Sequence, residues 1–444
     1  MLQPFVNQPL KEKKATVNTP KPPARKGIFL NLSLFQFLSF VRRGVFYTFM
    51  INYLFNLMHT VTYTALLGTL DMVASALGQN LLWGRLSDRY KIRTKLIVAG
   101  ESIAAVTYLI VFFIHRSLLN LQADFAAGMS LIVGLSILEF FWSMSDVGWA
   151  ALLADVTTSR TRGSIVGSLN FIASLGRMIG INFAGILYQG GEGFRQGTIF
   201  YVVITMLITS TILMWITSKS TEKSYEKTER TQTEDTVEKS TANYDSKTYM
   251  WFLASLIIIV IGAACISQVF LLFIKLPEGL NASDPEESLI LTAWTLGGML
   301  ASLSCGHLAD RIGRVKVITI GLTLAILTPL FYGLATNVPA LSLFYGLNGV
   351  SFWTIQTVGF TFAGDIIPQD RRGRLFSVYN TVMALSWGPA GLLIGGPLAD
   401  FQTKVLGLAP HNAYINTFYA STVIVALGTT LFITKVARRK TKTA

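Results

Sequence analysis

The sequence predicts an all-α membrane protein of twelve transmembrane helices in two six-helix bundles. Of its 444 residues, 51% are hydrophobic and only 14% are charged, and apolar stretches long enough to cross a membrane recur along the chain. Average globular proteins have about 25% charged residues, so a water-soluble core does not explain this composition. Stretches of about 20 apolar residues cross the hydrocarbon as helices, because backbone groups in lipid must pair within their own segment.

The expected spans form two sets of six on either side of a polar segment rich in Thr, Ser, Glu and Lys. In the first half we place them at 31–57, 62–83, 94–115, 126–150, 163–188 and 198–217. In the second half we place them at 249–275, 287–306, 316–336, 339–363, 373–396 and 412–436. The resulting units are a tail (1–30), an N-terminal bundle (31–217), a charged flexible linker (218–248), a C-terminal bundle (249–436) and a second tail (437–444).

The net charge of +13 is read as an orientation signal and not as a sign of a nucleic-acid partner. Of the 37 Lys and Arg residues, 30 fall on the side that holds both termini, and the opposite loops hold four: Arg116, Arg195, Lys275 and Lys404. The positive-inside rule then places both termini in the cytoplasm, with anionic lipid headgroups as contacts. The first 27 residues lack the apolar core of a cleaved signal peptide, so we expect a multi-pass protein of the cell (plasma or inner) membrane.

An internal repeat is the most informative feature of the sequence. Residues 84–89 (Gly-Arg-Leu-Ser-Asp-Arg) and 306–311 (Gly-His-Leu-Ala-Asp-Arg) match at an offset of 222, each at the end of the second span of its half. A second pair of loops also repeats, with an Asp seven residues before an Arg at 155–162 and at 365–372. Two paired loops in the same order indicate that six helices were duplicated, with a substrate path between the halves.

These residues resemble the major facilitator superfamily. Its loop pattern Gly-x-x-x-Asp-Arg-x-Gly-Arg is complete over 306–314, and in the first copy Lys91 replaces the second glycine. The resemblance covers roughly residues 30–436 and implies transport of a small solute by alternating access. A glycine series in the fifth span, Gly167, Gly176, Gly180 and Gly185, partly resembles drug/proton antiporters of that superfamily, and it also suits ordinary close helix packing.

The repeated loops are candidates for a gate. Asp88 and Asp310 are expected to face a neighbouring helix N-terminus, while Arg89 and Arg311 hold the carboxylate or contact headgroups. Such contacts would form when the cytoplasmic ends of the bundles meet and would favour the outward-open state. The alternative is that they are polar turn residues obeying the positive-inside rule. The full predicted set is Gly84, Asp88, Arg89, Asp155, Arg162, Gly306, Asp310, Arg311, Gly313, Arg314, Asp365 and Arg372.

Charged residues inside the spans of the first half are candidates for a substrate and proton site. Counting ~1.5 Å per residue from the cytoplasmic ends places Arg42, Asp71, Glu139 and Arg177 roughly 17–24 Å deep. Charges at that depth should face a cavity or an opposite charge, so Asp71 and Glu139 are the expected partners of Arg42, Arg43 and Arg177. The alternative is a structural ion-pair network. Asp146 is a weaker candidate and Glu101 the weakest.

The spans of the second half offer aromatic and amide side chains and no comparable charge. Candidates for contact with a solute are Gln268, Trp353 and Gln356, followed by Trp294, Asn348, Asn380 and Trp387. A charged wall opposite an uncharged one suits a solute with an ionic end and an apolar body. The pair Gly388–Pro389 should kink or bend the eleventh span.

The sequence lacks motifs of the other function classes. There is no His-Glu-x-x-His, Cys-x-x-Cys or P-loop pattern, so we expect no enzyme activity, no metal and no cofactor. The leading hypothesis is a monomeric, proton-coupled exporter of amphipathic small molecules, with protons as the coupling ion. The alternative within carriers is proton-coupled uptake of an organic anion or other small metabolite that the arginines would anchor. A channel or a receptor on the same fold is a further alternative.

Overall fold

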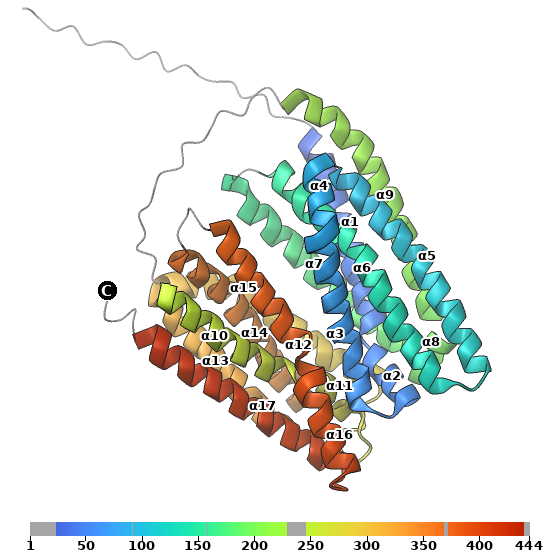
Figure 1. The fold of residues 1–444 in the computed structure, drawn as a ribbon, viewed down its shortest axis with the longest axis vertical. Coiled ribbons are helices and arrows are strands. Elements are labelled where there is room, and N and C mark those ends of the chain that lie inside the picture. The colour runs from blue at the N-terminus through green and yellow to red at the C-terminus, as the bar shows by residue number, and fades with distance from the viewer. Residues whose placement is uncertain (1–23, 91, 158, 229–245, 368–371, 439–444) are drawn as a thin grey trace, which may run out of the picture.

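The computed structural model describes residues 24–90, 92–157, 159–228, 246–367 and 372–438 (Figure 1). All regular elements in this part of the chain are helical, which confirms the all-α prediction. Within these described ranges, ten helices are long and apolar enough to cross a membrane. The other two predicted spans correspond to α1–α2, which is interrupted and carries Arg42 and Arg43, and to α14.

The N-terminal bundle contains the first six spans. Its elements are α1 (Ala24–Tyr47), α2 (Met50–Met58), α3 (Val61–Leu77), a π-helix η1 (Gly78–Trp83), α4 (Gly84–Tyr90), α5 (Arg93–Asn120), α6 (Asp124–Val156), α7 (Ser159–Tyr188), η2 (Gln189–Gly191), α8 (Glu192–Arg195) and α9 (Thr198–Thr228). The last helix runs to Thr228, well into the segment predicted as a linker, and residues 229–245 lie outside the described part of the chain.

The C-terminal bundle contains the other six. Its elements are α10 (Ser246–Ala264), α11 (Ser267–Lys275), α12 (Asp284–Ile312), α13 (Arg314–Tyr332), α14 (Val338–Ile366), α15 (Arg372–Trp387), η4 (Gly391–Gly395), α16 (Gly396–Lys404), α17 (Pro410–Phe432) and η5 (Ile433–Ala437). Helix α12 begins with a capping box between Ser283 and Glu286, and Asn337 caps α14 through its side chain.

Breaks divide three of the spans, and one of them confirms a sequence prediction. The eleventh span is interrupted at Gly388–Pro389, between α15 and η4, as the Gly-Pro pair predicts. The seventh span is interrupted at Cys265–Ile266. The seventh-span break lies against the end of η4, because a Cβ on Gly395 would come within 1.7 Å of the Cys265 carbonyl oxygen. Only glycine allows this approach of the two backbones.

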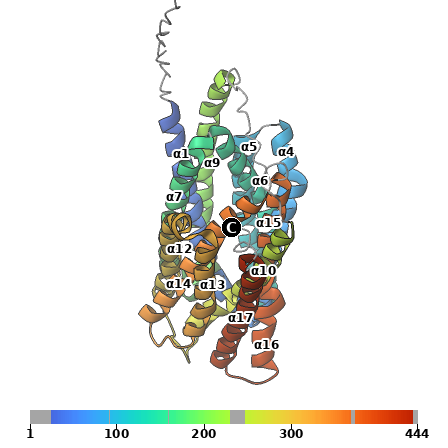
Figure 2. The same ribbon diagram turned by 90° about the vertical axis from the view of Figure 1, so that its left-hand side faces the viewer.

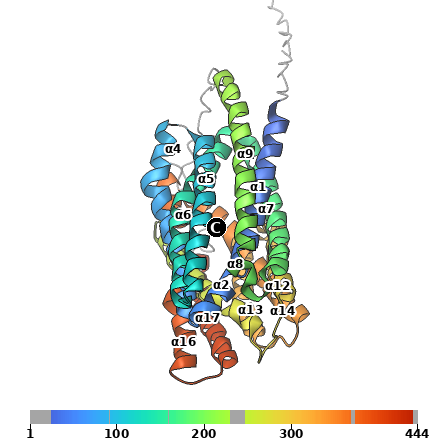
Figure 3. The same cartoon turned by 90° about the vertical axis from the view of Figure 1, so that its right-hand side faces the viewer.

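The two bundles draw apart toward one end of the molecule (Figure 1). We call this the terminus end, since α1 begins and η5 ends there. We call the other the loop end; it holds the connections 59–60, 121–123, 189–197, 276–283, 333–337 and 405–409. The bundles pack together through α7 on α12, α3 on α16 and η4, and α2 on α11. Views from the two sides show α9 reaching farthest at one end and α16 at the other (Figures 2 and 3).

Candidate functional site

An ion pair that is closed off from solvent lies in the N-terminal bundle. Arg42 Nη1 of α1 donates to Glu101 Oε2 of α5 over 3.1 Å, and both side chains are at most 2% exposed. Glu101 Oε1 also accepts from Trp142 Nε1 at 2.7 Å and from Ser145 Oγ at 2.9 Å, both on α6. The Glu101 carboxylate therefore joins three helices, and its charge is compensated inside the core.

Arg43, the next residue on α1, pairs with a different carboxylate. Its Nη2 lies 3.2 Å from Asp146 Oδ1 on α6, and these side chains are 36% and 41% exposed. The guanidinium carbons of Arg42 and Arg43 lie 3.9 and 4.6 Å from the ring centroid of Trp142. Such cation–π contacts stabilise a guanidinium where water is scarce. The two arginines thus share one tryptophan but face different surroundings.

Asp71 and Glu139 form no ion pair with any described lysine or arginine. Asp71 Oδ1 accepts a hydrogen bond from Ser136 Oγ at 3.0 Å. Glu139 is near enough to Asp146, Arg43 and Asp71 to interact with their charges, without direct contact to a cation. Both side chains are partly exposed. Protonating either carboxylate therefore breaks no ion pair within the described part of the chain.

This arrangement corrects the expected partners of the arginines. The sequence predicts Asp71 and Glu139 as the partners of Arg42 and Arg43. In the structure Arg42 pairs with Glu101 and Arg43 pairs with Asp146. Glu101 is the weakest of the predicted site carboxylates, yet its carboxylate is the one that neutralises Arg42. Counting depth along single helices places a residue at a level of the membrane, but it does not tell which face of the bundle the side chain occupies.

The C-terminal bundle contributes a cavity of about 540 Å³ that reaches α3 of the other bundle. The predicted residues Trp353 and Gln356 line it, together with Asn380 and Trp387. The single lining residue from the N-terminal bundle is Met72, which follows Asp71 on α3. The remaining lining residues are Val260, Thr357, Phe360, Thr361, Tyr379, Met383 and Ala384. The cavity therefore offers aromatic rings and amides, and it touches α3 at the residue that follows Asp71.

Other predicted polar residues lie around this cavity without lining it. Arg177 of α7 is exposed, and its guanidinium lies 5.4 Å from the ring of Trp294 on α12, so it reaches toward the other bundle. Asn348 joins Trp294 Nε1 to Thr328 through two hydrogen bonds of 3.1 Å. The Gln268 Oε1 atom is buried and has no hydrogen-bond partner among the described residues.

The glycines of the fifth span serve close helix packing. A Cβ on Gly180 would lie 2.2 Å from the Val41 carbonyl oxygen, and one on Gly176 would lie 2.6 Å from that of Phe37. These contacts bring α7 directly onto α1. Gly185 faces Ser288 of α12 in the same way, whereas Gly167 faces open space. The structure thus accounts for three of the four glycines by helix crossings.

At the terminus end, the repeated loops hold ion pairs within each bundle. Arg93 Nε lies 3.2 Å from Asp155 Oδ2 in the N-terminal bundle, and Arg314 pairs with Asp365 in the C-terminal bundle. Arg314 also donates to the Thr361 carbonyl at 2.8 Å. Arg93 was not among the predicted residues, although it occupies nearly the same place in the first copy as Arg314 does in the second.

The other predicted gate residues of the terminus end form no ion pair among the described residues, and most of those described are exposed. Arg89, Gly306, Asp310, Arg311 and Gly313 are exposed, and Gly84 is partly buried. Asp310 and Gly313 line a cavity of about 330 Å³ with Arg314 and Asp365. The side chains of Asp88, Arg162 and Arg372 lie outside the described residues.

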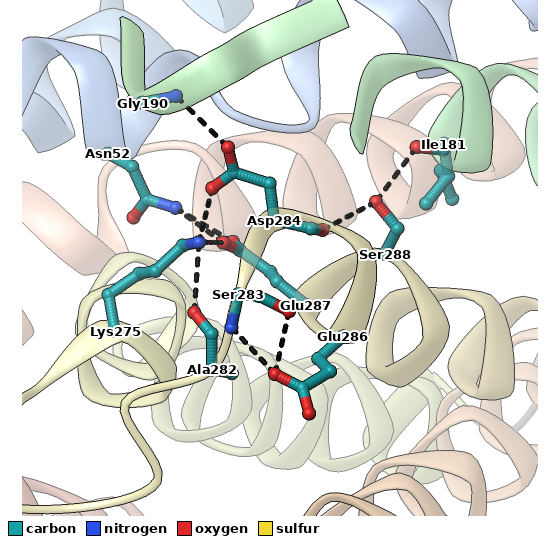
Figure 4. Close-up of polar contacts among 10 residues, drawn as sticks. All are labelled: Asn52, Ile181, Gly190, Lys275, Ala282, Ser283, Asp284, Glu286, Glu287 and Ser288. Atoms are coloured by element: carbon teal, nitrogen blue, oxygen red, sulfur yellow. Dashed lines mark hydrogen bonds and ion pairs between the residues drawn. The ribbon is translucent and has the colours of Figure 1, made fainter. Parts of the chain in front are cut away.

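Polar contacts between the bundles close the loop end (Figure 4). Asn52 Nδ2 of α2 donates to both carboxylate oxygens of Glu287 on α12, at 2.8 and 2.9 Å. Lys275 Nζ at the end of α11 lies 2.5 Å from Asp284 Oδ1 and 3.5 Å from Glu287 Oε2. The Gly190 amide of η2 donates to Asp284 Oδ2 at 3.0 Å. Three contacts among these residues therefore link α12 to the N-terminal bundle.

A second contact lies across the same end. Asp400 of α16 accepts hydrogen bonds from the amides of Val61 and Thr62, at 3.2 and 2.8 Å, and from the Thr62 hydroxyl at 2.6 Å. A carboxylate at the first turn of a helix is stabilised by the helix dipole. Lys404 Nζ donates to Thr60 Oγ1 at 2.8 Å. The C-terminal bundle thus caps α3 of the N-terminal one.

The prediction that the spans of the second half hold no charge comparable to those of the first does not hold for Glu287, the first residue of the predicted span 287–306. Glu287 is 0% exposed, and Asp284 and Asp400 are 18% and 14% exposed. Glu287 and Lys275 lie at the ends of predicted spans and Asp284 and Asp400 lie beyond them, where charged residues are common. One signal was present: the loop side has only four cations, and two of them, Lys275 and Lys404, take part in these contacts.

Comparison with known proteins identifies the family. A family model described as Major Facilitator Superfamily matches residues 32–283 and again residues 256–444, one match for each bundle. The chain belongs to the major facilitator superfamily. This is a family of multi-pass membrane transporters, and its two-domain repeat agrees with the duplicated loops of the sequence.

Individual relatives within the superfamily are distant. The chain is 24% identical over 340 residues to a homologue of the multi-drug resistance efflux pump PmrA from Lactococcus lactis, which covers 76% of the chain and 79% of the relative. It is 32% identical to the putative metabolite transport protein YncC of Bacillus subtilis over 141 residues. That match covers 32% of the chain and 28% of the relative. A match to an uncharacterized MFS-type transporter of Mycobacterium tuberculosis, 27% identical over 119 residues, spans 27% of the chain but only 17% of that protein.

Solved structures share the fold at low sequence identity. The nucleoside transporter NupG matches with a TM-score of 0.66 and 15% identity, over 91% of the chain and 99% of NupG. A bacterial homologue of the iron transporter ferroportin in an inward-facing state also gives a TM-score of 0.66, with 14% identity over 94% of the chain and 100% of that protein.

Proposed function

We propose that the chain is a secondary active transporter that exports amphipathic small molecules in exchange for protons by alternating access. The observation that carries the proposal is the cavity of about 540 Å³, with aromatic rings and amides on the C-terminal bundle and α3 of the N-terminal bundle at its edge. Ligand cavities in proteins combine such apolar walls with a few polar groups that fix orientation. An apolar body would lie on Trp353 and Trp387, and a cationic end would face Asp71 and Glu139.

The distribution of contacts supports alternating access. At the loop end, Asn52–Glu287 and Asp400–Thr62 tie one bundle to the other. At the terminus end, the pairs Arg93–Asp155 and Arg314–Asp365 stay within their own bundles. A rocking motion of the two bundles can break the first set without breaking the second, which is the motion expected around a central site.

The unpaired carboxylates support proton coupling. Desolvation disfavours the charged form of a carboxylate, and an approaching cation favours it. Asp71 and Glu139 are partly exposed, so a change of water access would alter their desolvation. Glu139 also lies within electrostatic reach of Arg43, which supplies the cation. A bound cation and a proton would then compete for the same carboxylates, so the binding of either would weaken the other.

The direction of transport is proposed from the relatives. A relative whose match covers 76% of the chain is named as a homologue of a multi-drug resistance efflux pump, and export of amphipathic compounds fits the aromatic cavity. The family's membership also includes putative metabolite transport proteins, so uptake is the alternative.

One observation favours an anionic solute instead. Arg177 is exposed, and its guanidinium reaches toward the ring of Trp294 on the other bundle. Guanidinium groups are the usual anchors of carboxylates and phosphates. Proton-coupled uptake of an organic anion is therefore the second candidate function.

Purified protein in liposomes separates the candidates. Protein-free liposomes set the passive baseline, because both probes cross lipid unaided. Above that baseline and under an imposed pH gradient, the proposed exporter accumulates a lipophilic cation such as tetraphenylphosphonium, whereas the second candidate accumulates labelled benzoate. Stoichiometric counter-flow of unlabelled solute distinguishes a carrier from a channel. Downhill leakage of either solute that is unaffected by pH would contradict proton coupling.

We further propose that both termini are cytoplasmic, as the Lys and Arg distribution predicts. The structure improves the labelling positions for the test, because Gln402 is only 6% exposed whereas Val405 is 69% exposed. Cysteines at Gln196 and Val405 should react with an impermeant reagent added outside intact cells. Reaction only after the cytoplasmic side is opened would reverse the topology.

A further inference from the structure

Glu287 is the most enclosed charged group of the loop end. Its side chain is 0% exposed, although it lies in the first turn of α12. The titratable groups that act on it come from four helices: Lys275 on α11, Asp284 on α12, Tyr188 on α7 and Tyr345 on α14. Tyrosines are neutral near pH 7, so the charge balance depends on one ammonium and two carboxylates.

That balance leaves one negative charge without compensation. Lys275 Nζ lies 2.5 Å from Asp284 Oδ1, donates to the Ala282 carbonyl at 3.1 Å, and stands 3.5 Å from Glu287. Asp284 is also the carboxylate with more solvent, at 18% exposed. The ammonium therefore belongs chiefly to Asp284, and an ionised Glu287 would be a fully buried charge with a weak ionic partner, which is costly.

Asn52 provides the second observation. It is 4% exposed, and its Nδ2 group donates to both oxygens of Glu287 while its Oδ1 atom is buried without a hydrogen-bond partner among the described residues. A half-turn of the amide exchanges these two atoms. Oδ1 would then face Glu287, where a hydrogen bond requires a proton on the carboxyl group. The same two side chains can therefore bond in either protonation state.

We propose that Glu287 and Asn52 form a proton-binding site that holds the loop end closed while the proton is bound. Opening this end separates α2 from α12 and gives Glu287 access to water, where the carboxyl group releases its proton. Closing buries Glu287 again, and burial costs less free energy once the carboxyl group has taken a proton from the loop side of the membrane. The site is separate from Asp71 and Glu139, and it rests on the alternating access of the proposed function.

The proposal fixes the sign of the pH response. Acid on the loop side favours the closed loop end, and alkali favours its opening. For one proton bound per closure, the ratio of closed to open molecules changes by at most about tenfold per pH unit. Lys275 and Asp284 keep their mutual ion pair throughout, so the response belongs to Glu287 alone.

A distance measurement across the loop end tests this. Spin labels on cysteines that replace Leu121 in the N-terminal bundle and Val405 in the C-terminal bundle occupy exposed positions, at 75% and 69% exposed. The native Cys265 and Cys305 are buried. We expect the full-length protein in lipid nanodiscs to show a short distance in acid and a growing long-distance population as the pH rises.

Three variants make the measurement specific. Glu287→Gln mimics the protonated group and should give the short distance at every pH. Asn52→Ala removes a hydrogen-bond partner that Glu287 has only in the closed end, so the end should still respond to pH but should open at lower pH than wild type. Glu286→Gln changes the neighbouring exposed carboxylate, keeps the capping of α12 and should retain the wild-type profile.

The outcomes separate this site from the proposed function. A wild-type pH profile in Glu287→Gln, or a loop end held open in that variant, overturns the site. So does an Asn52→Ala transition that is unmoved or moves to higher pH. A wild-type distance that responds to tetraphenylphosphonium but not to pH overturns the site and leaves the transporter standing. A distance that responds to neither overturns both.

Discussion

Carboxylates at two places in the N-terminal bundle differ in how their charge is satisfied. Glu101 has an arginine, an indole and a hydroxyl as partners and is 1% exposed. Asp71 has one serine hydroxyl, and Glu139 has no direct contact to a described cation. The groups lie within one six-helix bundle, so lipid depth alone does not explain the difference.

The difference separates a structural charge from one available for chemistry. A proton added to Glu101 breaks a buried ion pair, whereas a proton added to Asp71 or Glu139 breaks none. Intramembrane carboxylates that remain unpaired are costly for folding, which is why they mark functional sites. The comparison therefore predicts opposite mutational phenotypes for the two places.

The largest expected effect is on stability, at Glu101. Replacing Glu101 with Gln preserves an acceptor for Trp142 and Ser145 but leaves the Arg42 guanidinium buried without a counter-charge. Breaking a buried ion pair on one side costs about 3–5 kcal/mol. We expect loss of folded protein after detergent extraction, measured by size-exclusion yield and thermal melting.

A second substitution serves as the control. Arg42→Met combined with Glu101→Gln removes the unpaired charge and should recover much of the lost stability. Equal instability of the single and double variants would mean that the packing around Arg42, and not its charge, matters.

The next effect is on coupling, at Asp71 and Glu139. Asp71→Asn and Glu139→Gln should melt like wild type, since neither takes part in an ion pair with a described residue. At least one of them should reduce pH-driven uptake into liposomes to the level of equilibration while sparing downhill exchange. Full proton-driven accumulation by both variants would show that neither carboxylate carries the coupling proton, and Asp146 would be tested next.

A smaller effect is expected for the apolar wall opposite. Trp387 lines the cavity and is 39% exposed, so Trp387→Ala removes solute contact with little loss of packing. Trp353 is less suitable, because its ring fills the space beside Gly298. Losing one aromatic contact of about 1 kcal/mol should raise KM several-fold and leave kcat nearly unchanged. Trp251→Ala, on the outer face of α10, is the matched control.

Much of the fold could be predicted from the sequence, because span length and charge distribution are properties of single segments. All twelve predicted spans match helices, including the kink at Gly388–Pro389. The partners of the charges could not be predicted in this way. Arg42 and Glu101 lie 59 residues apart, and Asn52 and Glu287 lie 235 apart, so their pairing depends on helix rotation and on how the bundles meet.

The glycines of the fifth span, which is α7, illustrate the same limit. Their spacing resembled a family motif, but only the structure shows Gly176 and Gly180 against the backbone of α1 and Gly185 against α12. Of the two arginines that form ion pairs in the duplicated loops, Arg314 belongs to the predicted set as the last residue of the loop pattern, whereas Arg93 does not.

The smallest effect on stability is expected at the terminus end, at Asp310. This side chain is exposed and forms part of the small cavity that Arg314 and Asp365 also line. Removing one exposed charge usually changes stability by no more than about 0.5 kcal/mol, so Asp310→Asn should melt like wild type. Transport should nonetheless slow if, as we propose, the repeated loops face each other only when the terminus end closes, because a charge that acts in one conformation shifts the equilibrium between the two. Asp124→Asn at the loop end is the control of equal charge change and should transport normally. Wild-type turnover of Asp310→Asn at equal expression would remove the gate from this loop and leave it a polar turn.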